Sequence, residues 1–219
     1  MNLVFKISLI IHVIAGSIGL FTGTINMIRK KGDKTHKIVG KYFFLSMIIN
    51  SLAGFLIAAL HRNIFLLIIA IFSFYMTATG QRILSLKRID KGQNAKPVDW
   101  ILTILMSFLT LVFVILAFRL LIYNKDFGTV LIVFAAISGF MVKKDISIYQ
   151  GNIKQKNYWL LIHLQRMIGA YIAALTAFLV VNNTYLPPVF AWLLPTVILT
   201  PLIFYWSKKY AGKKYTRRR

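Results

Sequence analysis

Residues 5–28 read FKISLIIHVIAGSIGLFTGTINMI, and residues 29–34 continue with RKKGDK. A helix needs about 20 mainly apolar residues to cross the hydrocarbon core of a bilayer, and the first stretch is long enough. The basic residues that follow it are typical of a stop-transfer sequence, which argues against a cleaved signal peptide. This stretch therefore predicts a first membrane span that stays in the bilayer.

The same alternation of a long apolar run with a short polar segment continues to the end of the chain. Hydrophobic residues make up 58% of the 219 residues, a share too high for a soluble domain of this size. We predict an all-α, polytopic transmembrane helix bundle of about seven spans. The spans are expected near residues 5–28, 37–60, 64–84, 99–123, 127–142, 159–182 and 188–206, followed by a basic tail over residues 208–219.

Lys and Arg concentrate in every second connecting segment. Residues 29–35, 85–98 and 143–158 hold four each, and the tail from Lys208 holds seven. The intervening segments hold Arg62, Lys125 and, over residues 183–187, none. The positive-inside rule then predicts a protein of the bacterial cytoplasmic membrane, with its N-terminus outside and its C-terminus in the cytoplasm.

The formal charge of +22 is also seen in proteins that bind nucleic acids. Here, however, the cations flank apolar runs, as membrane anchors do, so no nucleic-acid partner is expected. The expected partners are the lipid bilayer and, at the cytoplasmic face, anionic lipids, which basic segments attract.

The residue inventory excludes several classes of function. The chain has no Cys and no Glu, and its five Asp residues are placed between the hydrophobic runs, with Asp99 at the start of the fourth predicted span. Thiolate chemistry, paired-carboxylate catalysis and hydrolytic triads therefore have no candidates, and no residue is assigned a catalytic role. No carboxylate is expected inside a span, which removes the usual relay of a proton-coupled or sodium-coupled transporter. An enzyme would depend on a bound cofactor or on a substrate held between the helices.

Small and polar residues mark the helix faces that are expected to pack inside the bundle. Such stripes recur at helical spacing in the first, second and sixth predicted spans, and they include His12 and Gly19, His36 and Asn50, and His163. The fourth span has no stripe of this kind, which predicts a peripheral helix.

The four histidines are the candidate functional residues, because imidazole alone among the side chains present suits metal ligation or proton exchange near neutral pH. The predicted topology places His36 and His163 near the cytoplasmic ends of two inward-facing helices, where we expect them to meet. His12 is expected in an outer polar cluster with Asn50, and His61 at the outer surface.

Three roles for these histidines compete. They form helix-packing contacts, or His36 and His163 ligate a b-type haem or a metal ion, or they line a polar pocket for an ion, a quinone or a small anion. Arg82, Arg166, Tyr42 and Tyr171 are expected at the same inner level as part of a cofactor site. There the two arginines would balance anionic groups such as haem propionates. The competing interpretation is that both arginines snorkel to lipid phosphates.

Several short motifs resemble those of a known family. They include His12 with Ala15-Gly16, the run Lys31-Gly-Asp-Lys-Thr-His36 with Gly40, Thr79-Gly-Gln-Arg82, and His163-Leu-Gln-Arg-Met-Ile-Gly-Ala-Tyr171. This pattern resembles the prokaryotic predicted-membrane-protein family known as domain of unknown function 2306. The resemblance implies a multi-pass bacterial membrane protein and leaves its activity open.

Two functional hypotheses follow from these residues. The first is a redox module that binds a b-type haem or a metal ion between His36 and His163. The alternative is a non-enzymatic membrane protein, either a small-solute or lipid carrier or an assembly partner, in which the histidines only pack.

Overall fold

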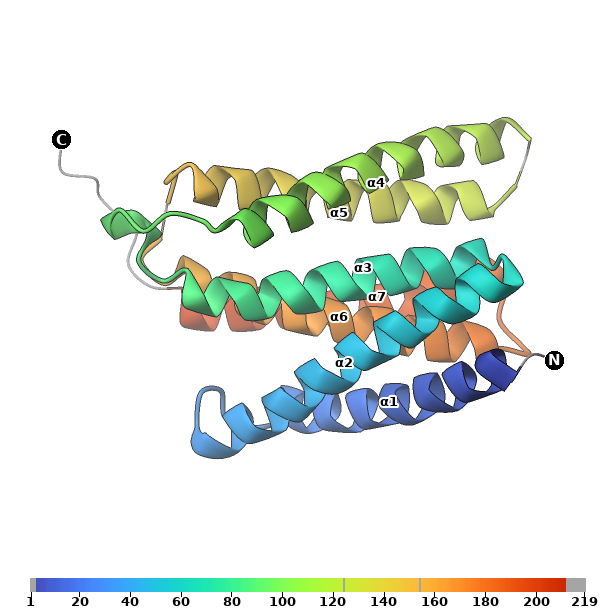
Figure 1. Ribbon diagram of the computed structural model, residues 1–219, viewed down its shortest axis with the longest axis horizontal. Helices are drawn as coiled ribbons and strands as arrows, with labels where there is room; N and C mark the ends of the chain where they lie inside the picture. The colour runs from blue at the N-terminus through green and yellow to red at the C-terminus, as the bar shows by residue number, and fades with distance from the viewer. Residues whose placement is uncertain (1–2, 124, 154, 212–219) are drawn as a thin grey trace.

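The computed structural model describes residues 3–123, 125–153 and 155–211, and it is built from helices (Figure 1). Its elements are α1 (Leu3–Ile28), α2 (Lys34–His61), α3 (Ile64–Arg82), the short 3₁₀ turns η1 (Ile83–Ser85) and η2 (Ile89–Lys91), α4 (Pro97–Ile122), α5 (Phe127–Tyr149), α6 (Tyr158–Asn182) and α7 (Pro188–Tyr210). Seven of the described helices are long and apolar enough to cross a membrane. The prediction of an all-α bundle with seven spans is confirmed. The predicted tail over residues 208–219 falls partly outside the described residues, which end at 211.

Local sequence signals set the helix starts near the cytoplasmic side of the predicted topology. Asp33 caps α2 by accepting a hydrogen bond from the His36 backbone N–H, at 2.6 Å. Asp99 closes the first turn of α4 by accepting from the Lys96 backbone N–H at 2.8 Å, next to a proline at the first helical position. These caps satisfy backbone donors that have no partner within the helix.

Four helices form a ring. α1 packs along α2, α2 along α3, α3 along α6, and α6 in turn contacts α1. α2 and α6 make no comparable contact and therefore occupy opposite corners of the ring. α7 lies outside it, packed mainly on α6.

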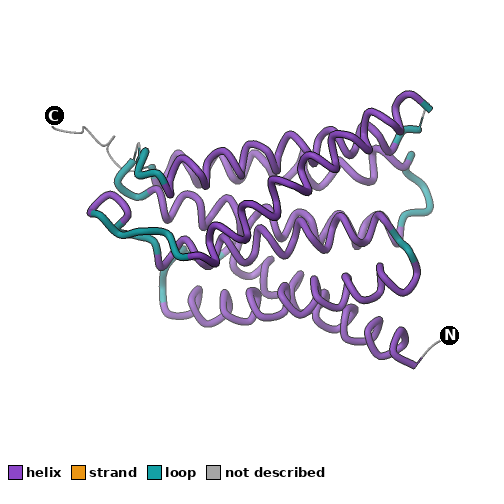
Figure 2. Tube along the Cα trace, turned by 45° about the horizontal axis from the view of Figure 1, so that its top comes forward, coloured by secondary structure: helices purple, strands orange, loops and turns teal. Residues whose placement is uncertain are grey.

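α4 and α5 form a hairpin that packs as a separate layer beside the ring (Figures 1 and 2). α4 contacts α5 along its length and touches α3 only sparsely. Its opposite face exposes large apolar side chains, including Ile104, Phe108, Leu111 and Ile115. α4 therefore lies at the periphery of the bundle, as predicted.

The predicted stripes mark the buried helix faces. Ser8, Ala15, Gly19 and Gly23 are buried on α1, and so are Phe43, Met47, Gly54 and Ala58 on α2. Gly23 permits the approach of α1 to α6, because a Cβ at this position would collide with the Tyr171 ring. Small residues thus set the interhelical spacing, as expected for helices that associate in lipid.

The fifth helix differs from its prediction. α5 continues to Tyr149 instead of ending near residue 142, and it carries Asp145 on its buried face with 2% of the residue exposed. The expectation that every carboxylate lies between the spans was therefore wrong for Asp145. The physical reason is a counter-charge, Arg166, which α6 places against it.

Candidate functional site

His163 is fixed by a hydrogen bond between two helices of the ring. Its Nδ1 lies 2.7 Å from the backbone carbonyl oxygen of Gly80 on α3. Because a carbonyl oxygen only accepts, Nδ1 carries the hydrogen in this contact, and the neutral ring then keeps its lone pair on Nε2. Histidines that ligate a metal commonly donate their other ring N–H to a carbonyl oxygen in this way.

His36 reaches the same end of the ring from the opposite corner. His163 acts electrostatically on His36, which places both histidines at the same end of the ring, and their meeting as joint ligands stays a prediction. The His36 Nδ1 atom is buried and has no hydrogen-bond partner among the described residues. Buried polar atoms are rarely left unpaired, so this one calls for an explanation.

Asn26 on α1 provides a second unpaired atom beside His36. Its Nδ2 donates to the His36 backbone carbonyl at 3.3 Å, while its Oδ1 is buried without a partner. An acceptor oxygen and an imidazole nitrogen of complementary character are thus both unsatisfied next to the same helical turn.

Three lysines supply positive charge around these imidazoles. Lys31 and Lys37 act electrostatically on His36, and Lys87 acts on His163. The Lys31 ammonium donates to the carbonyls of Asn26 and Met27 at 2.6 and 2.7 Å, and it lies 4.5 Å from the Trp206 ring centre. Burial, followed by repulsion from Lys209, lowers the pKa of Lys31.

Arg82 does not join the histidines. Its guanidinium forms a bidentate ion pair with Asp99 on α4, with Nε to Oδ1 at 2.8 Å and Nη2 to Oδ2 at 2.9 Å. Asp99 is 1% exposed and also accepts from the first turn of its own helix. This pair ties the end of α3 to the start of α4, so the prediction that Arg82 balances a cofactor anion loses its basis.

Arg166 is likewise committed elsewhere. It is 3% exposed, and its Nη2 lies 2.8 Å from Asp145 Oδ1. The guanidinium also donates to the Thr79 hydroxyl and, at 3.2 Å, to the Met141 carbonyl. Tyr75 donates its hydroxyl to the other Asp145 oxygen at 2.5 Å. This buried network joins α3, α5 and α6, and it satisfies the charge of Arg166 without any cofactor anion.

The two tyrosines that were predicted for the site, Tyr42 and Tyr171, lie in different surroundings. Tyr42 is 60% exposed on the outer side of α2 and does not face the ring interior, which removes it from the candidate site. Tyr171 is buried, and its hydroxyl lies 2.8 Å from the Thr24 hydroxyl on α1. Tyr171 therefore supports the wall between α1 and α6.

The outer polar cluster is realised as a contact between α1 and α2. His12 Nδ1 lies 3.0 Å from the Asn50 backbone carbonyl, so His12 and Asn50 share a depth as predicted. Gly54 packs beside the His12 ring and Gly16 beside the Asn50 side chain. The His12 Nδ1 is paired within the protein, whereas the Asn50 Oδ1 is buried without a partner among the described residues.

A site for a bare metal ion is not supported. Over residues 3–123, 125–153 and 155–211, no three His, Cys, Asp or Glu side chains gather as metal ligands would. The pair His36 and His163 alone would leave an ion's coordination incomplete. A porphyrin, by contrast, brings four ligands of its own and needs only axial ones from the protein.

Sequence reasoning missed several residues of this region. Contacts described above involve four residues that were not predicted for the site, Asp99, Asp145, Tyr75 and Asn26. The cations that act on the histidines include Lys31 and Lys87 in place of the two predicted arginines. One signal was available for Asp145, since Met141, Asp145 and Ile148 continue the helical period beyond residue 142.

Comparisons with known proteins add no assignment. No family model matches the chain, no curated protein matches it, and no solved structure matches it. The resemblance to domain of unknown function 2306 therefore stays a prediction from the motifs, and what the described residues establish is a chain with the seven apolar helices of a multi-pass membrane protein.

Proposed function

We propose that this multi-pass membrane protein binds a b-type haem between His36 and His163, near the cytoplasmic end of the ring of α1, α2, α3 and α6, and that it acts as a redox module. The observation that supports the proposal is that α2 and α6, at opposite corners of the ring, carry these two histidines at the same end, where His163 acts electrostatically on His36. The proposal includes a bacterial cytoplasmic membrane as the location, with the α2 start and the α6 start on the cytoplasmic side.

The donor chemistry of the residues fits this group. His163 donates its Nδ1 hydrogen to Gly80, which fixes the ring and directs the Nε2 lone pair away from α3. The His36 Nδ1 is buried and has no hydrogen-bond partner among the described residues. A hydrogen bond to this nitrogen would orient the His36 ring as the Gly80 carbonyl orients His163.

The chain's own residues have three tasks in this proposal. His36 and His163 would hold the haem, the Gly80 carbonyl orients the His163 ring, and Asn26 supports the first turn of α2 through the His36 backbone carbonyl. Lys31 and Lys87 would offset anionic substituents at the cytoplasmic level. When bound between two imidazoles, a b-type haem supplies one-electron transfer. The packed apolar side chains of the ring, such as Met47 and Phe43, exclude water from below the site.

A visible spectrum tests the proposal directly. The protein is produced in haem-replete cells, purified in mild detergent, and measured as isolated and after reduction with dithionite. A Soret band with an α band that sharpens on reduction supports the haem proposal. The absence of a Soret band contradicts it. Metal analysis of the same sample checks for a bare ion.

A second candidate function is favoured by the His163 contact itself. The hydrogen bond from His163 to Gly80 joins α6 to α3 and is sufficient reason for a buried imidazole. In this case the chain is a non-enzymatic membrane protein, a carrier or an assembly partner. Replacing His163 with Ala would then lower thermal stability in a protein that shows no haem spectrum in any form.

A further inference from the structure

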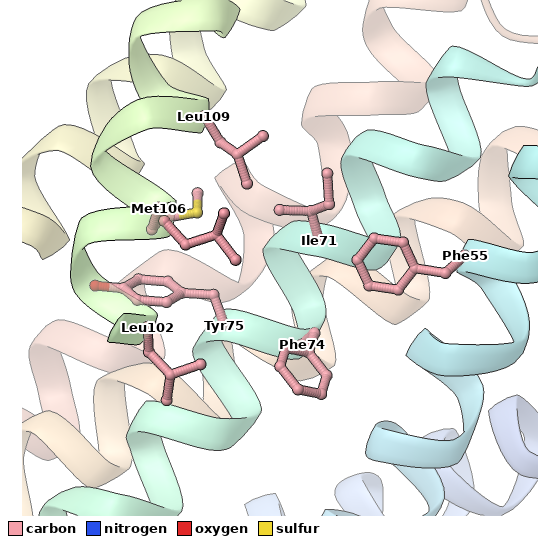
Figure 3. A pocket seen from close by; sticks show the side chains of 8 residues that line it. Phe55, Ile71, Phe74, Tyr75, Leu102, Met106 and Leu109 are labelled. Atoms are coloured by element: carbon pink, nitrogen blue, oxygen red, sulfur yellow. The ribbon is translucent and has the colours of Figure 1, made fainter. Parts of the chain in front are cut away.

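A groove of about 220 Å³ lies between the ring and the α4–α5 hairpin (Figure 3). One wall comes from α4, where Leu102, Leu105, Met106 and Leu109 recur on a single helical face. The opposite wall comes from α3, with Ile71 and Tyr75, and Phe55 of α2 closes one side. The groove exists because α3 and α4 are joined at one end and touch little elsewhere.

The floor of the groove is apolar and buried, and its edge is exposed. Met106 and Tyr75 at the floor are 1% and 3% exposed, whereas Leu105 at the edge is 54% exposed. The Tyr75 hydroxyl, the one polar side-chain group among the lining residues, points away from the groove to Asp145. An apolar space of this kind does not hold water well and accepts hydrocarbon.

The α4 residues that line the groove cover part of one leaflet of a bilayer. From Leu102 to Leu109, α4 rises about 10 Å. This is about a third of the roughly 30 Å hydrocarbon core. The ion pair of Arg82 with Asp99 lies about one helical turn before Leu102, on the side of the linker over residues 83–96. The groove therefore has the length of a segment of one acyl chain.

The linker that precedes α4 is positively charged. The linker over residues 83–96 carries Lys87, Arg88, Lys91 and Lys96 against the single acid Asp90. Arg82 itself is neutralised by Asp99, whereas Lys96, directly before α4, and Lys91, at the end of η2, are exposed. Cations at this level attract anionic lipid headgroups.

We propose that the groove between α3 and α4 is a binding site for one acyl chain of an anionic phospholipid of the cytoplasmic leaflet, with its phosphate near Lys91 and Lys96. Such a lipid would fill the space between the hairpin and the ring. The proposal does not depend on a bound haem, and it rests on the cytoplasmic placement of the linker over residues 83–96.

Photo-crosslinking in nanodiscs tests this site. The wild-type chain is reconstituted with phosphatidylglycerol that carries a diazirine near the end of one acyl chain, irradiated, and mapped by peptide mass spectrometry. Crosslinks are expected on the α3 and α4 segments around Ile71 and Leu109. A phosphatidylcholine probe with the same chain should label these segments several-fold less.

Matched variants locate the chain and the headgroup. Leu105→Trp fills the edge of the groove and should reduce labelling several-fold, whereas Leu111→Trp, on the exposed face of the same helix, should leave it unchanged. Both positions are more than half exposed, so both variants are expected to fold. Replacing Lys91 and Lys96 with Gln should remove the preference for phosphatidylglycerol, and Lys125→Gln should not.

Three outcomes would overturn the proposal. They are labelling spread evenly over the outer face of α4, labelling that Leu105→Trp leaves intact, and crosslinks to a second copy of the chain in place of lipid. Equal labelling by both headgroups would refute the part that concerns Lys91 and Lys96. Binding of soluble phosphate by a chain that shows no lipid labelling would assign the cations to a free anion. It would also contradict a lipid site.

Discussion

His163 on α6 and Gly80 on α3 share a hydrogen bond of 2.7 Å between the imidazole Nδ1 and the backbone carbonyl oxygen. The contact depends on close helix packing at this point, because a Cβ on Gly80 would lie 2.7 Å from the Arg166 Cβ. The glycine therefore brings a carbonyl within reach of a buried ring, and it does so next to the network that ties α5 to the bundle.

Replacing Gly80 with Ala should separate α3 from α6. Overpacking of this kind typically costs about 1–3 kcal/mol, and here it also lengthens the hydrogen bond to His163. We expect a lower melting temperature in detergent and, if haem is bound, a weaker Soret band per protein. Gly139→Ala is the matched control, since its added Cβ would meet only Thr110 at 3.7 Å. Equal behaviour of the two variants would contradict the tight approach at Gly80.

The buried pair of Arg166 and Asp145 should respond asymmetrically to substitution. Arg166→Met or Asp145→Leu alone leaves one buried charge unpaired, which typically costs about 3–5 kcal/mol. The double variant removes both charges and should recover most of that loss. Arg29→Gln, which breaks an exposed pair with Asp33 at 3.6 Å, should change stability little. Thermal unfolding of the four variants measures this pattern, and a double variant no more stable than either single one would refute it.

Much of this architecture could be predicted from the chain alone, for a definite reason. Long apolar runs must form helices in lipid because each backbone polar group needs a hydrogen-bond partner. The helical structure of runs such as residues 5–28 can therefore be predicted from the run itself. Small residues such as Gly23 and Gly54 likewise mark packed faces without reference to the rest of the fold.

The charged contacts could not be read in the same way. Lys143, Lys144 and Asp145 interrupt the apolar run of α5, and local hydropathy therefore ends the span too early. The helix continues because Arg166, on another helix, neutralises Asp145. Only the depth of Arg82 in the membrane places it with the histidines in the sequence prediction. Its bidentate ion pair with Asp99 depends on how α4 is positioned relative to α3. The depth of a residue in the membrane can be predicted from a sequence. The direction in which its side chain points around the helix axis, and its partner on another helix, depend on the fold.

Acid should weaken the start of α2 through Asp33. The hydrogen bond from the His36 backbone N–H is the main cause that lowers the pKa of the Asp33 carboxyl below its ordinary value of 3.8. A carboxyl with a lowered folded-state pKa contributes stability above its unfolded pKa, and that stability is lost as the pH falls through the folded value. The difference in melting temperature between the wild type and Asp33→Asn should therefore shrink on acidification below about pH 4. A difference that stays constant from pH 7 to pH 3.5 would contradict this role.

The orientation can be tested on a background free of cysteine, because the chain contains none. We expect Lys91→Cys to react with an impermeant thiol reagent only in inside-out vesicles, and Thr184→Cys only in right-side-out ones. Both positions are exposed in the connecting segments. Labelling of both residues from the same side would remove the shared depth assigned to the histidines and to the lipid site.

The most direct test of the central claim is the haem content of single histidine variants, measured as the pyridine haemochrome per mole of purified protein from haem-replete cells. The account predicts haem in the wild type, in His61→Ala and in His12→Ala, and its loss in both His36→Ala and His163→Ala. A wild type without haem, or a His36→Ala or His163→Ala variant that keeps the wild-type content, would contradict the claim that these two imidazoles hold a shared ligand.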